Sequence, residues 1–92
     1  MSVKVKFYLS LKEAGLPGKE MTFDVKSGIS VLEFLKMLGK RYPSFKRSYL
    51  SHWLDEEKEP PLLIVKNDKP VKLGSSIEED DYIKIFEVLS GG

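Results

Sequence analysis

The last four residues, Leu89-Ser90-Gly91-Gly92, are the segment of this sequence best suited to chemistry. Two consecutive glycines carry no side chains, so they can lie extended in a narrow channel and present the Gly92 carboxylate to ATP bound by an activating enzyme. The plain alternative is a frayed chain end, because terminal residues are commonly disordered and glycine is a common residue. We predict that residues 89–92 are a flexible Gly-Gly tail whose reacting residues are Gly92 and Gly91.

Other catalytic and metal-binding groups are scarce. The sequence has no cysteine, which excludes disulfides, thiolate metal sites and cysteine nucleophiles. Its one histidine, His52, stands beside Trp53 without the oriented partners that a general base needs. The acidic runs at 55–57 and 78–81 lie in polar connections, where charged residues are usually just solvated. We therefore predict no metal site, no stably bound cofactor and no catalysis by this chain alone.

Length and composition indicate one globular unit. The chain has 92 residues, of which 41% are hydrophobic and 32% charged. Its longest purely apolar run, at 62–65, is far shorter than the ~20 residues of a membrane-spanning helix. The N-terminus has no hydrophobic stretch of the secretory type. We expect a single domain over residues 1–92, no membrane contact and a cytoplasmic location.

Alternation of apolar and polar residues predicts several strands. In the first of them Tyr8 lies on the polar face, and in the last one Ile83 and Ile85 point inward. The two earliest strands make an antiparallel hairpin. Asn67-Asp68 is a turn signal between two later strands. The strands are expected at residues 3–9, 20–25, 62–66, 71–73 and 82–88.

One helix is signalled by its start and its stop. Ser30 and Glu33 form an S-x-x-E capping box, so the helix should begin at Val31. Pro43 disfavours helical geometry at the residue before it, so the helix should end near Arg41 or Tyr42. Residues 44–61 have a loosely helical spacing followed by charged residues and two prolines, which we interpret as a short helix or turn plus an exposed loop.

The order of these elements indicates a fold. A hairpin, one long helix and a returning last strand bury the helix on one face of a mixed sheet, with the first and last strands adjacent at its centre. This is the α+β arrangement called β-grasp, or ubiquitin-like. We predict a mixed sheet of four to five strands packed on one main helix.

Over nearly its whole length the chain resembles the small subunit of molybdopterin synthase (MoaD) and its sulfur-carrier and ubiquitin-like relatives. Many members end in Phe-Pro-Pro-Val-x-Gly-Gly, and this chain has Phe-Glu-Val-Leu-Ser-Gly-Gly at 86–92, equal in length but without both prolines. The resemblance rests on residues 3–9, Gly28-Ile29-Ser30-Val31, Arg41-Tyr42-Pro43, residues 65–71 and Asp80-Asp81-Tyr82-Ile83.

The resemblance implies a carrier protein that is an enzyme's substrate. An E1-like adenylyltransferase of the MoeB or ThiF type would use ATP to adenylate the Gly92 carboxylate, and a sulfur donor would convert it to a thiocarboxylate. The large subunit of molybdopterin synthase, of the MoaE type, would then use this sulfur for the dithiolene of a molybdenum or tungsten cofactor. Another sulfur carrier, or a protein modifier that acylates lysines, would use the same Gly92.

A partner-binding face follows from the strand alternation. Tyr8 and Phe86 point away from the helix on strands expected to be neighbours, where they should form an exposed aromatic patch. A pair of half-covered aromatics on a sheet is also ordinary. The resemblance adds Pro70 near this face and, in the segment that leads to the glycines, Val88, Leu89 and Ser90.

A function of another class remains open on the same sheet face. Three lysines and the two aromatics could bind single-stranded nucleic acid by stacking and by phosphate contacts. No arginine lies on that face, and alternating lysines commonly solvate an exposed sheet, so we expect no nucleic-acid partner. The residues concerned are Lys4, Lys6, Tyr8, Lys84 and Phe86.

Overall fold

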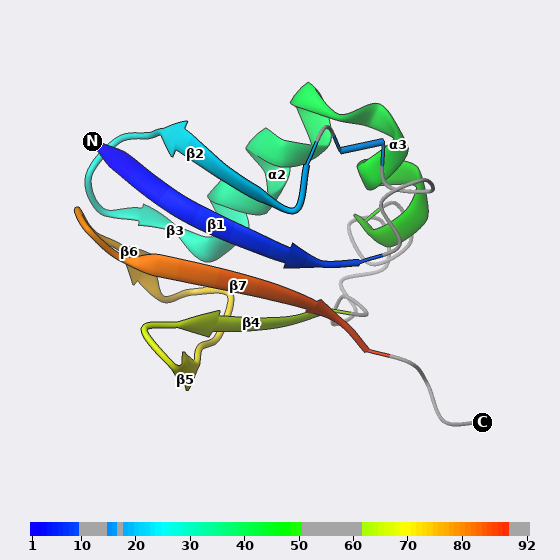
Figure 1. Cartoon of the computed structure of the whole chain (residues 1–92). Helices are drawn as coiled ribbons and strands as arrows, with labels where there is room; N and C mark the ends of the chain where they lie inside the picture. The colour runs from blue at the N-terminus through cyan, green and yellow to red at the C-terminus, as the bar shows by residue number, and fades with distance from the viewer. Residues whose placement is uncertain (10–14, 17, 51–61, 89–92) are drawn as a thin grey trace.

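A mixed sheet with a helical layer against one face makes up the fold (Figure 1). The computed structural model describes residues 1–9, 15–16, 18–50 and 62–88. Within them, β1 and β7 pair in parallel at the sheet centre, and the other neighbouring strands are antiparallel. This adjacency of the first and last strands is the predicted one. The sheet order is β2 (Glu20–Asp24), β1 (Ser2–Tyr8), β7 (Tyr82–Glu87), β4 (Leu62–Lys66) and β5 (Lys69–Pro70).

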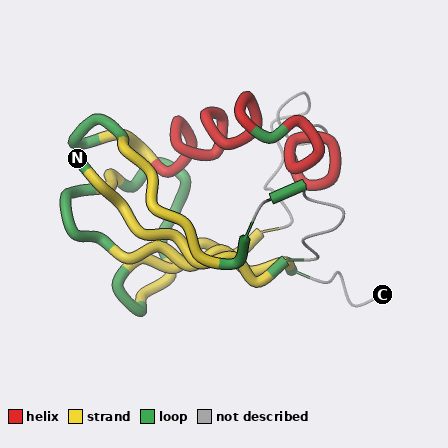
Figure 2. Tube along the Cα trace, turned by 45° about the horizontal axis from the view of Figure 1, so that its top comes forward, coloured by secondary structure: helices red, strands yellow, loops and turns green. Residues whose placement is uncertain are grey.

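The alternating residues of the central strands form the floor of the core. Val3, Val5 and Phe7 of β1 are buried, as are Ile83 and Ile85 of β7. The helix α2 (Val31–Arg41) covers this face of the sheet, as Figure 2 shows from a second angle. The predicted α+β, β-grasp fold is therefore confirmed.

The helix start and stop are also confirmed. The Ser30 hydroxyl accepts a hydrogen bond from the Glu33 N–H at 3.0 Å, and the Glu33 carboxylate accepts one from the Ser30 N–H at 3.4 Å. These bonds satisfy two amides that would otherwise lack helical partners. No helix among the described residues is long and apolar enough to cross a membrane.

A second helical segment follows α2. It consists of α3 (Pro43–Phe45) and a π-helical turn, η1 (Lys46–Leu50), which confirms a short helix in the first part of the 44–61 stretch. Residues 51–61, which include His52, lie outside the described residues. Gly39 of α2 allows close packing here, because a Cβ at this position would lie 3.1 Å from Leu50 Cδ1.

The predicted return strand at 71–73 is wrong, because β5 comes two residues earlier, at Lys69–Pro70. Asn67 and Asp68 have φ values of 50° and 69°, as the two central residues of a type I′ turn require. Such a tight turn brings Lys69 directly opposite Lys66. Backbone pairing therefore starts at once after the turn.

The segment after β5 leaves the sheet to cap the helix. The carbonyls of Leu73 and Ser75 accept hydrogen bonds from the N–H groups of Leu32 and Val31, each at 2.9 Å. These two donors belong to the first turn of α2, which has no partners of its own for them. The same segment forms a small two-stranded sheet, β3 (Ile29–Ser30) with β6 (Ser76–Ile77), which the sequence did not predict.

Candidate functional site

The outer face of the sheet, away from α2, carries an exposed row of large apolar side chains. Phe86 of β7 is the register partner of both Tyr8 on β1 and Leu63 on β4. The Tyr8 and Phe86 rings are stacked, with centroids 4.4 Å apart and planes 5° apart. Tyr8 is 40% exposed and Leu63 is 43% exposed. We call Tyr8, Phe86 and Leu63 the apolar row.

The sequence predicted the placement of Tyr8 and Phe86 and missed Leu63. Leu63 stands in the apolar run 62–65, which alone gives no sign of which residues face outward. The pairing of Leu63 with Phe86 settles its side of the sheet, because directly paired residues share a face. Strict alternation through β4 was the one available signal.

A row of lysines borders the apolar row. Lys6 and Lys84 are register partners, and each precedes Tyr8 or Phe86 by two residues on β1 or β7. The Lys6 ammonium lies 5.4 Å from the centre of the Tyr8 ring, and the Tyr8 hydroxyl raises the pKa of Lys6 above its ordinary value. Lys6 is therefore fully charged at neutral pH. The outer face combines an apolar strip with adjacent positive charge, which suits a partner surface with apolar and acidic groups.

Pro70 lies at the edge of the same face. It is exposed in β5 and pairs with Val65, whose other neighbour is Lys84. Pro70 is thus at the end of the lysine row and does not extend the apolar row. Pro70 and the aromatic patch thus lie on the same face of the sheet.

The end of β7 connects this face to the C-terminal segment. Phe86 and Glu87 are the last two residues of the strand, and the next residue, Val88, is 49% exposed. The Tyr49 hydroxyl donates a hydrogen bond to the Glu87 carboxylate. The predicted tail residues, Leu89, Ser90, Gly91 and Gly92, lie outside the described residues.

The geometry of the outer face weighs against the single-stranded nucleic-acid hypothesis. Tyr8 and Phe86 stack on each other, so each ring has one face already occupied. The Lys4 ammonium lies 3.8 Å from the Glu20 carboxylate, and the Lys84 ammonium lies 3.5 Å from the Asp68 carboxylate. These acidic neighbours reduce the positive potential that phosphates would meet.

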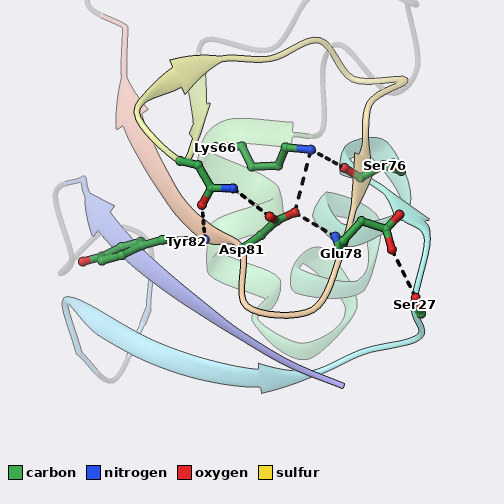
Figure 3. Close-up of polar contacts among 7 residues, drawn as sticks. Ser27, Lys66, Ser76, Glu78, Asp81 and Tyr82 are labelled. Carbon is green, nitrogen blue, oxygen red and sulfur yellow. Dashed lines mark hydrogen bonds and ion pairs between the residues drawn. The ribbon is translucent and has the colours of Figure 1, made fainter.

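Two members of the acidic run at 78–81, Glu78 and Asp81, make structural bonds (Figure 3). The Asp81 carboxylate accepts hydrogen bonds from the Asn67 side chain at 2.7 Å and from the Glu78 N–H at 2.8 Å, with the Lys66 ammonium at 3.7 Å. Burial raises the pKa of Asp81, but these three donors outweigh it and hold that pKa below the ordinary value. No cluster of three metal-ligating side chains occurs among the described residues.

A groove beside β4 offers no pair of acid–base groups. It has a volume of about 510 Å³ beside β4, and its wall is formed by Leu62, Leu63, Ile64, Val71, Lys72, Leu73 and Gly74. Aliphatic residues and one lysine provide no pair of groups for proton transfer.

Solved structures share this fold. A small archaeal modifier protein 1 (SAMP1) from Methanosarcina acetivorans is 26% identical, with a TM-score of 0.70 over 99% of this chain and 96% of that one. A molybdopterin converting factor subunit 1 from Pyrococcus furiosus is 21% identical, with a TM-score of 0.71 over 97% and 99%.

A third similar structure contains a partner protein. It is the complex of subunits 1 and 2 of molybdopterin-converting factor from Helicobacter pylori, 18% identical with a TM-score of 0.57 over 100% of both chains. A search of curated protein sequences finds no match. The model of the ThiS family matches residues 5–92, which include the glycines at 91 and 92. The chain therefore belongs to the ThiS family, with the fold of ubiquitin-like sulfur carriers and protein modifiers.

Proposed function

We propose that this chain is a sulfur carrier whose Gly92 carboxylate is activated and converted to a thiocarboxylate. The observation that carries the proposal is the ThiS family match, which runs through residues 91 and 92. Small carriers of this kind are generally not catalysts. The protein acts as a substrate that several enzymes handle in turn, in the cytoplasm.

The proposed chemistry has two steps. A Gly92 carboxylate oxygen attacks the α-phosphorus of ATP on an E1-like adenylyltransferase of the MoeB or ThiF type, and pyrophosphate leaves. Sulfide delivered by a sulfur donor then attacks the carbonyl carbon, and AMP leaves with the bonding electrons. The product is a thiocarboxylate on Gly92. The absence of side chains at 91 and 92 favours this reaction, because both residues can lie within a narrow channel.

The apolar row has a defined part in this proposal. Tyr8, Phe86 and Leu63 dock on the partner protein, and the chain after β7 leads Val88, Leu89 and Ser90 toward the partner's active site. Pro70 lies at the rim of the docking face. Phe86 of the apolar row and Val88, where the tail begins, both lie at the end of β7. A partner bound to the apolar row is therefore close to the tail.

Among the finer roles, we favour the small subunit of molybdopterin synthase, which transfers the sulfur to a dithiolene precursor together with a large subunit of the MoaE type. The similar molybdopterin converting factor subunits from P. furiosus and H. pylori support this choice. A protein modifier is the second candidate, favoured by the similarity to the M. acetivorans modifier protein. In that case the activated Gly92 acylates a target lysine.

Intact-mass spectrometry of the protein purified from its own cells tests the proposal. A sulfur carrier should show a mass gain equal to the replacement of one oxygen by sulfur, located at Gly92, and a large synthase subunit should copurify. Lysine conjugates of Gly92 would assign the modifier role. A carboxylate that is always free, in cells that are unaffected by removal of Gly91-Gly92, would contradict both.

A further inference from the structure

A charged residue stands on the core side of the last strand. Ile83 and Ile85 of β7 point inward and are fully buried, and the alternation places Glu87 on the same side of the sheet. A carboxylate facing a core loses free energy unless it is hydrogen-bonded. Glu87 has such a bond, from the hydroxyl of Tyr49.

Tyr49 is held firmly on the opposite layer. It belongs to the π-helical turn η1, and its side chain is buried, with 7% exposed. Its ring centroid lies 5.6 Å from that of Phe45, which is fully buried. The hydroxyl is therefore presented from a fixed position, 38 residues away in sequence from the carboxylate that it binds. Single π-helical turns are often found at functional sites.

The bond acts where the chain leaves the fold. Glu87 is the last residue of β7, and Val88 directly after it is the last residue of the chain that the structure describes. Beyond the strand, the direction of the chain at Val88 depends on how Glu87 is held. A hydrogen bond to a charged group is among the stronger single contacts of this kind.

We propose that Tyr49 is a positioning residue for the C-terminal tail, and that its bond to Glu87 fixes the direction of the chain at Val88, where the sheet ends. This inference rests on the proposed function, in which a partner receives the tail. If the chain is already held in one direction at Glu87 and Val88, less conformational freedom is lost when the tail enters an active site. The bond therefore raises the rate of Gly92 adenylation without contributing to docking.

Tyr49→Phe removes the hydroxyl and keeps the ring. Tyr42→Phe is the matched control, because Tyr42 is half-buried in the same helical layer and its hydroxyl has no hydrogen bond with the described residues. With an E1-like activating enzyme from the same cells, Tyr49→Phe should lower kcat for adenylation about tenfold, as expected for loss of a hydrogen bond to a charged group. Its KM should stay within about twofold, because the docking face is intact.

A second measurement follows the mobility of the chain at Val88, directly after β7. The ¹⁵N heteronuclear NOE of the Val88 amide should fall in Tyr49→Phe and stay unchanged in Tyr42→Phe, because only the first variant frees Glu87. A merely structural role for Tyr49 would lower the melting temperature and leave this local signal unchanged. If Tyr49→Phe does not fold, Glu87→Leu removes the same bond from the other partner.

The outcomes separate this inference from the proposed function. A wild-type chain that no activating enzyme adenylates contradicts the proposed function itself. A wild-type chain that is adenylated, together with a Tyr49→Phe variant of equal kcat and an unchanged Val88 signal, overturns only the positioning role.

Discussion

Asp81 has a structural role, although an acidic residue at this position in the sequence could also have bound a cation. An acidic run is compatible with cation binding, and Asp81 is its last member. In the structure its carboxylate joins the β4–β5 turn, through Asn67, to the start of β7 and to the backbone at Glu78. Both ends of the last strand are thus fixed by a carboxylate, Asp81 at the start and Glu87 at the end. Asp81 therefore acts as a structural clamp.

We expect Asp81→Asn to lower the free energy of unfolding by about 2 kcal/mol at pH 7, because a buried carboxylate with several donors is lost. The folded pKa of Asp81 is below its ordinary value of 3.8. The stabilisation is thus fully present above that value and is lost as pH falls through the folded pKa. Urea unfolding at a series of pH values should show a smaller acid loss in the variant than in the wild type.

Asp80→Asn is the control for this prediction. Asp80 is exposed beside Asp81, and its φ of 68° suits asparagine as well as aspartate. Its unfolding curve should follow that of the wild type. An equal acid loss in Asp81→Asn and the wild type would show that Asp81 does not contribute this pH dependence.

The pairing of strands brings together side chains that are far apart in the sequence. The apolar row exists only because β1, β7 and β4 are neighbours in the sheet, although they are far apart in the chain. The registers Tyr8–Phe86 and Leu63–Phe86 place three side chains on one line. A shift of one residue in either register would move one of these side chains to the opposite face.

Leu63→Asp should weaken binding to the activating enzyme about tenfold or more, because it puts a charge into an apolar contact. Thr22→Asp is the control, since it adds the same charge to an exposed outer-face position on β2, away from the row. Isothermal titration gives both dissociation constants. Equal affinities for Leu63→Asp and wild type would contradict a docking role for the row, as would unchanged binding of a Tyr8→Ser/Phe86→Ser double variant.

Gly15→Ala should lower the free energy of unfolding by about 1–2 kcal/mol, because two effects act in the same direction. Gly15 has a φ of 68°, and an added Cβ would lie 2.9 Å from Ser44 Cβ in α3. Gly74→Ala is the control, because a Cβ at Gly74 would meet nothing within 4 Å. Thermal unfolding of the two variants should differ, and equal melting temperatures would contradict this account of Gly15.

In the whole molecule, the residues that stabilise the fold and the residues proposed to react belong to different parts of the chain. Among the described residues, the buried side chains lie between positions 3 and 85, and the residues proposed to react come at 91 and 92 in the sequence, after the last strand. Such a carrier can present a reactive end to several enzymes without changing its fold. Tyr8, Leu63 and Val88 are the exposed large apolar residues in the described part of the chain, and such enzymes can contact them.

Deletion of Gly91-Gly92 should leave the melting temperature unchanged and abolish adenylation, because a glycine has no side chain to bury and Gly92 carries the reacting carboxylate. Differential scanning calorimetry and a pyrophosphate-exchange assay measure the two properties. A deletion variant that keeps its function in the cell would contradict the carrier role. RNA binding that survives the deletion and falls steeply with salt would instead support the nucleic-acid hypothesis.

The sequence alone determined the features with a strong local cause. Alternation predicted β1, β2 and β7, the apolar run at 62–65 predicted β4, and the capping box at Ser30 predicted the start of α2. The order of these elements was enough for the β-grasp fold, because few topologies bury one helix on such a sheet. Tyr8 and Phe86 could be assigned to one face by the same alternation. The Gly-Gly candidate site came from the two glycines together with the predicted element order and the last strand that leads into them.

Only the tertiary structure decided the features that depend on distant partners. The sequence did not identify Leu63 as an outer-face residue, because its side was set by pairing with Phe86. The β3–β6 sheet was missed because each strand has two residues, too few for a period to be visible. The clamps at Asp81 and Glu87 join residues 14 and 38 positions apart. Such contacts arise from packing, and local sequence periodicity carries no record of them.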